Sequence, residues 1–318
     1  MELVTADDVR AAASRIRGHV VRTPLTLGPH GTDLLLKPES LQPTGAFKLR
    51  GATNAVAQLT PVQRERGVVT HSSGNHGLAL ALASARQGVP CTVVVPQGAP
   101  EVKVERIRAH GARVVTVPPA ERLATATELR DRELRALIPP FDDPRVIAGQ
   151  GTVGLEVLEQ SPEVTTIVVP VGGGGLASGV ATAARAAHTR VRVVGVEPEL
   201  AADAAESLRE GRLVAWAPER THRTMADGVR VCLSERTFAH LSARLDEIVT
   251  VSEEEIARAV SALAHGARLV SEPSGALATA AVLAGKVETV SGRPEATVAV
   301  VSGGNVDPAL FTRLTTVD

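Results

Sequence analysis

The fold is decided by one stretch of the sequence, Thr166-Ile167-Val168-Val169-Pro170-Val171-Gly172-Gly173-Gly174-Gly175-Leu176. Its first half is a continuous run of mostly β-branched residues, which is typical of a strand in a parallel sheet buried on both faces. Four glycines follow at once and let the backbone approach a ligand closely. N–H groups that precede a helix hold phosphate well. The stretch therefore predicts an α/β fold with a phosphate site at a strand end.

A tight turn is the alternative interpretation of the four glycines, but a turn rarely needs four in succession. The stretch is not a Walker A loop, because it lacks the Gly-Lys-Ser/Thr ending. It is also a poor match to the dinucleotide-binding fingerprint. Phosphate binding outside those two motifs is therefore favoured.

Strands and helices alternate outward from this stretch in both directions. The predicted strands cover 68–70, 92–95, 113–117, 166–171, 191–196, 248–251 and 297–301. The predicted helices cover 75–86, 101–109, 119–137, 176–187, 201–209 and 253–269. Another helix is expected after Thr5, which forms a capping box with Asp8, and Ser252 with Glu255 forms a second box. Alternation of this kind implies mostly parallel sheets covered by helices.

The composition excludes several classes of protein. The chain has 318 residues and a formal net charge of −1, so no global field attracts nucleic acid or an anionic membrane. Aromatic residues make up only 2%, which argues against stacking on nucleobases. The first residues lack a signal-peptide pattern, no apolar stretch is long enough to span a bilayer, and two cysteines make no disulfide framework. We therefore expect a cytoplasmic enzyme or binding protein.

Two further glycine-bearing loops lie at predicted strand ends, where parallel sheets bind ligands. Residues 71–77 are HSSGNHG and lie between a strand and a helix. Capping of that helix is their simplest role, and His76 alone is expected to be a structural, hydrogen-bonded residue. The functional alternative is that this helix start binds a carboxylate through N–H groups and hydroxyls. Residues 301–305, VSGGN, end the last strand and direct Ser302 toward a ligand.

Lys48 follows Thr44-Gly45-Ala46-Phe47 at the start of a helical run. A lone lysine is usually a solvated surface charge. Here Phe47 adjoins it, and an amine lodged among apolar groups has a lowered pKa, which makes it a nucleophile toward an aldehyde.

Four motifs occur in a fixed order along the chain. They are Thr44-Gly45-Ala46-Phe47-Lys48, Ser72-Ser73-Gly74-Asn75-His76, Gly172–Gly175 and Ser302-Gly303-Gly304-Asn305. Together they closely resemble the serine/threonine dehydratase and serine racemase family of fold-type II pyridoxal-phosphate (PLP) enzymes. The resemblance covers nearly the whole chain and includes residues 149–152 and 226–228. Each motif is modest by itself, whereas the ordered set is highly specific.

The resemblance implies that PLP forms a Schiff base with Lys48 and that its phosphate lies in the glycine loop. The residues expected to bind the cofactor are Phe47 beside the ring, Lys48, Asn75 at the ring 3′-oxygen, Gly172, Gly173, Gly174, Gly175, Leu176, Gly228, and Ser302 at the pyridine nitrogen. A serine hydroxyl, unlike an aspartate, does not force that nitrogen to be protonated. The ring is then a weaker electron sink, which favours elimination of a β-hydroxyl over transamination.

The same resemblance implies a small hydroxy amino acid as substrate and Lys48 as the base that removes its α-proton. The residues expected to bind the substrate are Ser72, Ser73, Asn75 and His76. Ser73 is also a predicted catalytic residue, because serine racemases carry serine where many threonine dehydratases carry alanine. A hydroxyl on the ring face opposite Lys48 would give the two bases that racemisation requires.

Residues 197–203 resemble the divalent-cation site of the same family. Glu197 and Asp203 would supply carboxylates and Ala201 its carbonyl oxygen to Mg²⁺, Ca²⁺ or Mn²⁺. The alternative is a helix start enriched in acidic residues for dipole reasons.

We therefore predict a serine/threonine ammonia-lyase of two α/β lobes, a larger one over 1–52 and 141–318 and a smaller one over 53–140. The resemblance also implies a homodimer. A serine racemase with side lyase activity and a threo-3-hydroxyaspartate dehydratase are the alternatives. The second of these would need a further cationic contact for the second carboxylate of its substrate, and the sequence does not show which arginine provides it. A non-catalytic PLP-binding protein is the third alternative, and the intact Lys48 and Ser73 argue against it.

Overall fold

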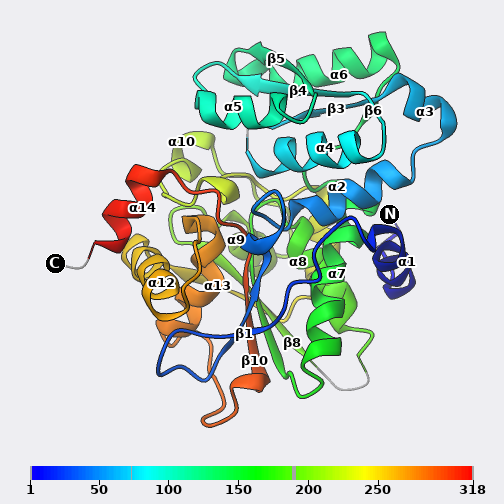
Figure 1. Ribbon diagram of the computed structural model, residues 1–318. Coiled ribbons are helices and arrows are strands. Elements are labelled where there is room, and N and C mark those ends of the chain that lie inside the picture. Colours follow the sequence, from blue (N-terminus) through cyan, green and yellow to red (C-terminus); the bar gives the residue numbers. More distant parts are fainter. Residues whose placement is uncertain (1, 73, 188–190, 317–318) are drawn as a thin grey trace.

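The computed structural model describes residues 2–72, 74–187 and 191–316, which build two separate sheets flanked by helices (Figure 1). The strands are β1 (Thr26–Leu27), β2 (Leu35–Pro38), β3 (Val68–His71), β4 (Cys91–Pro96), β5 (Arg113–Val117), β6 (Ala136–Leu137), β7 (Thr166–Pro170), β8 (Arg192–Pro198), β9 (Glu247–Val251) and β10 (Thr297–Val301). The larger sheet has the order β1-β2-β10-β7-β8-β9, and the smaller has the order β5-β4-β3-β6. All pairs are parallel except β1 with β2, which confirms the mostly parallel α/β fold.

Helices surround both sheets (Figure 1). The α-helices are α1 (Ala6–Ile16), α2 (Lys48–Ala57), α3 (Pro61–Arg66), α4 (Asn75–Arg86), α5 (Glu101–Arg108), α6 (Arg122–Glu133), α7 (Pro144–Gln160), α8 (Gly175–Ala184), α9 (Asp203–Glu210), α10 (Pro218–Thr221), α11 (Glu235–Arg244), α12 (Glu253–Gly266), α13 (Pro273–Leu283) and α14 (Pro308–Thr315). Short 3-10 helices are η1 (Glu39–Leu41), η2 (Pro119–Glu121), η3 (Asp227–Val229) and η4 (Pro294–Ala296).

The apolar run of β7 is buried on both faces, as its sequence predicts. Val168 packs with residues of α12 and α13 on one side of the sheet. Ile167 and Val169 point the other way and pack with residues of α8. Successive side chains of a strand alternate between the two faces, so a continuous apolar run is what a sheet covered by helices on both sides requires.

Several predicted elements agree with the structure and one is wrong in part. The strands over 113–117 and 297–301, the helix over 75–86 and both capping boxes are confirmed. The helix predicted over 119–137 ends early, because Leu134 adopts a left-handed φ of 54°. The chain then forms β6, in which Ala136 and Leu137 pair with β3. The lobe limits, 1–52 with 141–318 and 53–140, stay a prediction.

The sheet order brings glycine-bearing loops together. β7 and β10 are parallel neighbours, with Thr166 opposite Thr297. The loops that follow them, from Gly172 and from Ser302, therefore leave the same edge of the larger sheet. Ligands bind at this edge in parallel α/β sheets.

A largely buried ionic cluster lies beneath the start of α2. The Arg50 guanidinium donates to both oxygens of Glu39 at 2.7 Å and to both oxygens of Glu156 at 2.7 and 2.9 Å. Lys37 Nζ donates to Glu156 at 2.7 Å. Since Arg50 follows Lys48 by two residues, the cluster anchors the helix that begins with Lys48 to η1 and α7.

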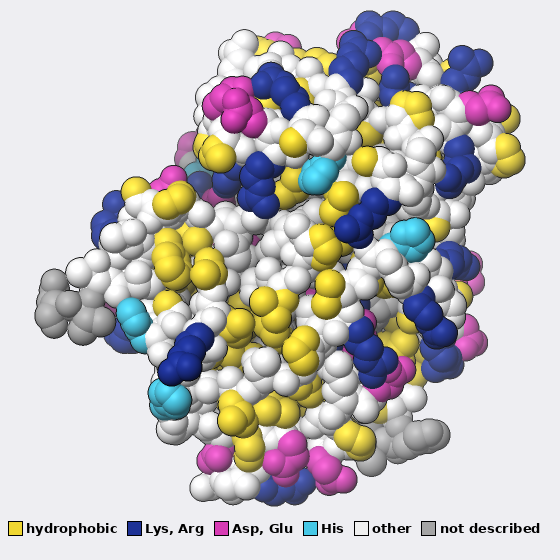
Figure 2. Space-filling model, viewed as in Figure 1, with side chains coloured by type: hydrophobic (Ala, Val, Ile, Leu, Met, Phe, Trp, Pro, Cys, Tyr) yellow, Lys and Arg dark blue, Asp and Glu magenta, His cyan; other side chains and the backbone are white. Residues whose placement is uncertain are grey.

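In the view of Figure 1 and Figure 2, hydrophobic side chains gather on the surface of the part of the molecule that contains the larger sheet. Exposed apolar residues in neighbouring segments include Leu27 in β1, Leu41 in η1 and Val270 before α13. Among the helices of the described residues, none is both long and apolar enough to cross a membrane.

Candidate active site

Lys48 is the first residue of α2, and backbone hydrogen bonds tie this helix start to the loop after β10. The N–H of Phe47 donates to the carbonyl of Ser302 at 3.0 Å. The N–H of Gly304 donates to the carbonyl of Gly45 at 2.8 Å. Lys48 and the loop that carries Ser302 therefore lie side by side.

The amine of Lys48 is held in a desolvated position. Its Nζ donates to the carbonyl of Pro140 at 2.8 Å and lies 4.9 Å from the centre of the Phe47 ring. Burial lowers the pKa of Lys48 to about 8, although the nearby carboxyl of Glu272 raises it in part. A larger fraction of this amine is neutral near pH 7 than of an ordinary lysine, so it is a better nucleophile and base.

Asn75, the first residue of α4, joins the two sheets through its side-chain amide. Its Nδ2 donates to Glu272 Oε1 at 2.7 Å. The Oδ1 of Asn75 accepts from Asn305 Nδ2 at 2.7 Å. Asn305 Nδ2 also donates to the carbonyl of Thr44 at 2.7 Å. The loops after β3 and β10 and the Lys48 motif thus meet at one amide.

Glu272 is a site residue that the sequence analysis did not single out. It is 5% exposed and precedes α13. Burial, and secondly the charge of Asp227, raise the pKa of Glu272 to about 7. In the sequence, a glutamate before Pro273 is what any helix start shows for dipole reasons, so no local signal marked it.

The glycine loop forms a backbone cradle. A Cβ on Gly173 would lie 2.3 Å from Cδ1 of Phe141, and one on Gly172 would lie 2.8 Å from Cα of Val229. Gly174 has a φ of 82° and gives α8 no side-chain cap. The first N–H groups of α8, including that of Leu176, lack partners within the helix. An uncapped helix start that is closed in by neighbouring residues suits an anion such as phosphate.

Ser274 hydrogen-bonds to two of the residues that were predicted to bind the cofactor. The N–H of Gly228 donates to Ser274 Oγ at 2.8 Å. The hydroxyl of Ser302, which is 5% exposed, donates to the carbonyl of Ser274 at 3.4 Å. Ser274 was not predicted, and it joins two residues that were.

The loop after β3 contains the predicted substrate-binding residues. Ser72 Oγ accepts from the N–H of Gly74 at 3.3 Å. Nε2 of His76 donates to the carbonyl of Ile138 at 3.0 Å, and burial lowers the pKa of His76 to about 3, with the charge of Lys48 as the second cause. His76 is therefore neutral and hydrogen-bonded. Ser73 lies outside the described residues.

The predicted cation ligands lie at the end of β8 and the start of α9. Both oxygens of Glu197 accept backbone N–H groups, from Ala204 at 3.2 Å and Ala205 at 2.7 Å. Both carboxylate oxygens of Asp203 are buried and have no partner of good hydrogen-bond geometry among the residues that the structure describes. Burial raises the pKa of Asp203 to about 6, although the nearby thiol of Cys232 and the N–H of Leu233 lower it in part. Burial, and secondly the charge of Asp203, raise the pKa of Glu197 well above its usual value. No group of three or more metal-binding side chains occurs in the described ranges.

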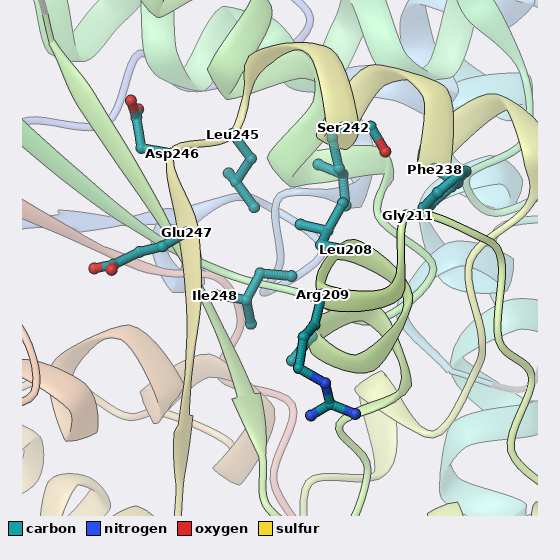
Figure 3. Close-up of a pocket in the computed structure, with 11 residues that line it drawn as sticks. Leu208, Arg209, Gly211, Phe238, Ser242, Leu245, Asp246, Glu247 and Ile248 are labelled. Atoms are coloured by element: carbon teal, nitrogen blue, oxygen red, sulfur yellow. The ribbon is translucent and has the colours of Figure 1, made fainter.

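A separate hollow of about 640 Å³ lies between α9, α11 and β9 (Figure 3). Leu208, Phe238 and Ile248 are among its lining side chains. None of the residues placed around Lys48 lines it, so it is distinct from the Lys48 site; Ala205, beside the predicted cation ligands, is part of its wall.

The geometry around Lys48 suits a phosphate-bearing aldehyde. The amine provides a nucleophile, the glycine loop provides an anion cradle, and the Asn75 amide provides a further hydrogen-bond donor. This arrangement has the parts that the sequence resemblance assigns to PLP.

Comparisons with known proteins support that interpretation. A family model described as "Pyridoxal-phosphate dependent enzyme" matches residues 16–303. An L-threonine ammonia-lyase of Thermotoga maritima is 40% identical over 98% of this chain and 78% of its own. A serine racemase of Arabidopsis thaliana is also 40% identical, over 94% of this chain and 92% of its own. The solved structure of maize serine racemase matches with a TM-score of 0.91 and 36% identity, over 98% of this chain and 97% of its own.

Proposed function

Because the chain belongs to the family of pyridoxal-phosphate dependent enzymes, with the fold-type II architecture of its serine and threonine relatives, we propose that it is an ammonia-lyase. It converts L-serine or L-threonine into a 2-oxo acid and ammonia. The observation that carries the proposal is the half-buried Lys48, whose amine has a pKa lowered to about 8, beside the loop that carries Ser302. Asn75 joins that loop through its hydrogen bond with Asn305.

The residues present fit the cofactor. The phosphate would be held by the N–H groups of Gly172–Gly175 and Leu176, the 3′-oxygen by Asn75, and the pyridine nitrogen by Ser302. Bound PLP supplies a carbonyl for the substrate amine and an electron sink for the bonds at Cα. Phe47 and Gly228 would close the site around the ring.

The chain's own groups would do the following work on the substrate. The N–H groups and hydroxyl of the loop around Ser72 bind the carboxylate, with Asn75 and His76 shaping that loop. Lys48 Nζ accepts the α-proton, for which a base with a pKa of about 8 is well matched to neutral pH. Loss of the β-hydroxyl as water, and hydrolysis of the remaining C–N bond, give the 2-oxo acid and ammonia.

A substrate panel tests this proposal. Purified protein with added PLP is incubated with L- and D-serine, L- and D-threonine and threo-3-hydroxyaspartate, and 2-oxo acid, ammonia and enantiomers are quantified. We expect pyruvate from L-serine or 2-oxobutanoate from L-threonine, in equal amounts with ammonia. A PLP-loaded protein that is inert toward every member would support the non-catalytic alternative and end the proposal.

A serine racemase is the second candidate function, because relatives of that name match as well as the ammonia-lyases do. Ser73 would then be the second base, on the face opposite Lys48. The variant Ser73→Ala should lose racemisation and turnover of the D-isomer and keep the lyase reaction on the L-isomer. Unchanged racemisation in this variant would exclude that role.

We also propose a divalent cation between Glu197, Asp203 and the carbonyl of Ala201. Its support is the pair of buried Asp203 oxygens, which have no hydrogen bond of good geometry from the described residues, with only weaker contacts to the Cys232 thiol and the N–H of Leu233. A buried carboxylate without a partner is costly, and a cation would relieve that cost. Mg²⁺, Ca²⁺ and Mn²⁺ all accept such oxygen ligands.

Assembly and location complete the proposal. A homodimer is supported by the exposed side chains of Leu27, Leu41 and Val270 in neighbouring segments, and light scattering would test it. A cytoplasmic location is supported by the two free thiols of Cys91 and Cys232.

A further inference from the structure

A chain of side chains runs from the smaller sheet's helix α5 to a buried carboxyl beside Lys48. Arg106 Nη1 donates to Asn305 Oδ1 at 2.9 Å. Asn305 Nδ2 donates to Asn75 Oδ1, and Asn75 Nδ2 donates to Glu272 Oε1, both at 2.7 Å. Glu272 is the buried end of this chain, and no role assigned so far uses it.

The surroundings of Glu272 hold its carboxyl in one place. A Cβ on Gly303 would lie 2.4 Å from Glu272 Oε1, so the carboxyl packs directly against the backbone of the loop that carries Ser302. The N–H of Glu272 donates to the carbonyl of Gly303 at 3.1 Å. The carboxyl group and the backbone N–H of Glu272 therefore both contact Gly303 of the same loop.

We propose that Glu272 is a positioning residue of the cofactor site, which fixes the Asn75 amide and stabilises positive charge at Lys48 Nζ. This inference rests on the proposed function, because the Asn75 amide is the expected partner of the cofactor's 3′-oxygen. It adds a residue that sequence motifs do not include.

The argument for the amide is one of hydrogen-bond counting. A side-chain amide has two N–H donors and one oxygen acceptor. Asn305 occupies the oxygen of Asn75, and Glu272 takes one N–H. The amide cannot rotate by half a turn without losing both partners, so its second N–H keeps one direction. A hydrogen bond to a carboxylate is about twice as strong as one between neutral groups.

The argument for Lys48 is electrostatic. The negative charge of Glu272, which the carboxyl carries above its pKa of about 7, raises the pKa of Lys48 against the effect of burial. Other charges face Glu272 as well: Asp227 from η3 raises its pKa and Lys103 from α5 lowers it. Removing the charge of Glu272 while keeping its shape should therefore make the amine easier to deprotonate.

The test compares Glu272→Gln, Glu272→Ala and the control Glu288→Gln, which changes an exposed glutamate outside the site. Two quantities are measured on each protein: the dissociation constant of PLP, by titration of PLP-free protein, and the pH at which the visible absorption of bound PLP changes. Glutamine keeps an acceptor for Asn75 and removes the charge. Alanine removes both.

We expect Glu272→Ala to raise the dissociation constant about 10- to 100-fold, which is the value of one charge-assisted hydrogen bond. Glu272→Gln should change it by less than about threefold, whereas the pH of the spectral change should fall by roughly one unit because a negative charge is lost. Glu288→Gln should match the parent protein in both measurements.

The inference is overturned if the spectral change of Glu272→Gln occurs at the parent pH, an outcome that does not depend on whether the alanine variant folds. It is also overturned if Glu272→Ala folds and binds PLP as the control does. Both results require a parent protein that binds PLP. A parent protein that binds none would instead refute the proposed function.

Discussion

Replacing Arg50 with glutamine should destabilise the protein far more than an ordinary surface change. The Arg50 and Glu39 side chains are both 0% exposed, and Glu156 is 13% exposed. In Arg50→Gln, Glu39 keeps only its hydrogen bonds from Thr23 and Gln42. Removing one partner of a buried pair costs about 3–5 kcal/mol, because the other charge stays buried and uncompensated. We expect that loss in the free energy of unfolding at pH 8.

The sign of the pH dependence follows from Glu39. In the parent protein, burial raises the pKa of Glu39, but Arg50 outweighs it and holds the pKa below 4.5. This contribution to stability is present above pH 4.5 and is lost as the pH falls through the folded-state pKa. In Arg50→Gln, burial prevails and the pKa rises, so protonation relieves the penalty as the pH falls. The difference between the two proteins should therefore be smaller at pH 5 than at pH 8.

The assay is urea unfolding of PLP-free protein, since bound cofactor would add stability of its own. The fluorescence of Trp216, the only tryptophan, reports the transition. The matched control is Arg10→Gln. The side chains of Arg10 and of its partner Asp7 are 56% and 88% exposed, so this ion pair should contribute about 0–1 kcal/mol to the free energy of unfolding. The reasoning is refuted if Arg50→Gln loses no more than Arg10→Gln, or if its deficit grows toward pH 5.

Three further predictions concern single sites. Gly173→Ala should raise the dissociation constant of PLP at least about tenfold in a titration, because the Cβ of the introduced alanine would lie 2.3 Å from the Phe141 ring. Unchanged binding would contradict the close packing of the glycine loop. A saturating divalent cation should raise the unfolding temperature of chelator-treated parent protein by several degrees, because a ligand at 100 times its Kd adds about 2.7 kcal/mol of stability. The unfolding temperature of Asp203→Asn should not change. An equal response of both proteins would exclude the proposed cation site. Arg106→Ala should weaken PLP binding about two- to threefold, since it removes one exposed hydrogen bond to Asn305. The control Arg108→Ala, which removes an ion pair with Glu101, should leave PLP binding unchanged. Equal dissociation constants of the two variants would show that the contact between Arg106 and Asn305 does not affect PLP binding.

The parts of the fold with strong periodic patterns could be predicted from the sequence. The strand over 113–117 and the helix over 75–86 were found because their apolar residues follow the periods of a strand and a helix. Helix α7 was not predicted, since it contains Gly149, Gly151 and Gly154, which lower helix propensity. The structure shows the reason for one of them: a Cβ on Gly149 would lie 2.6 Å from the Cα of Gly51, so two helices touch through their backbones. Such tertiary contacts override local propensity.

Some residues of the candidate site could also be predicted from the sequence, and others could not. Lys48, the glycine loop and the loop around Asn75 were visible because each is a contiguous motif at a strand or helix end. Glu272 was not, because its partner Asn75 is 197 residues away in the chain. Folding alone creates that pair, together with the desolvation that raises the pKa of Glu272 to about 7. Ser274 and the carbonyl of Pro140 were missed for the same reason.

The most direct test of the account is to find which lysine carries the cofactor. The chain has only four lysines, Lys37, Lys48, Lys103 and Lys286. Borohydride reduction of PLP-loaded protein, followed by proteolysis and mass spectrometry, should place one phosphopyridoxyl group on Lys48, and Lys48→Ala should lose both the label and the lyase activity. A label on another lysine, or full turnover by Lys48→Ala, would contradict the account.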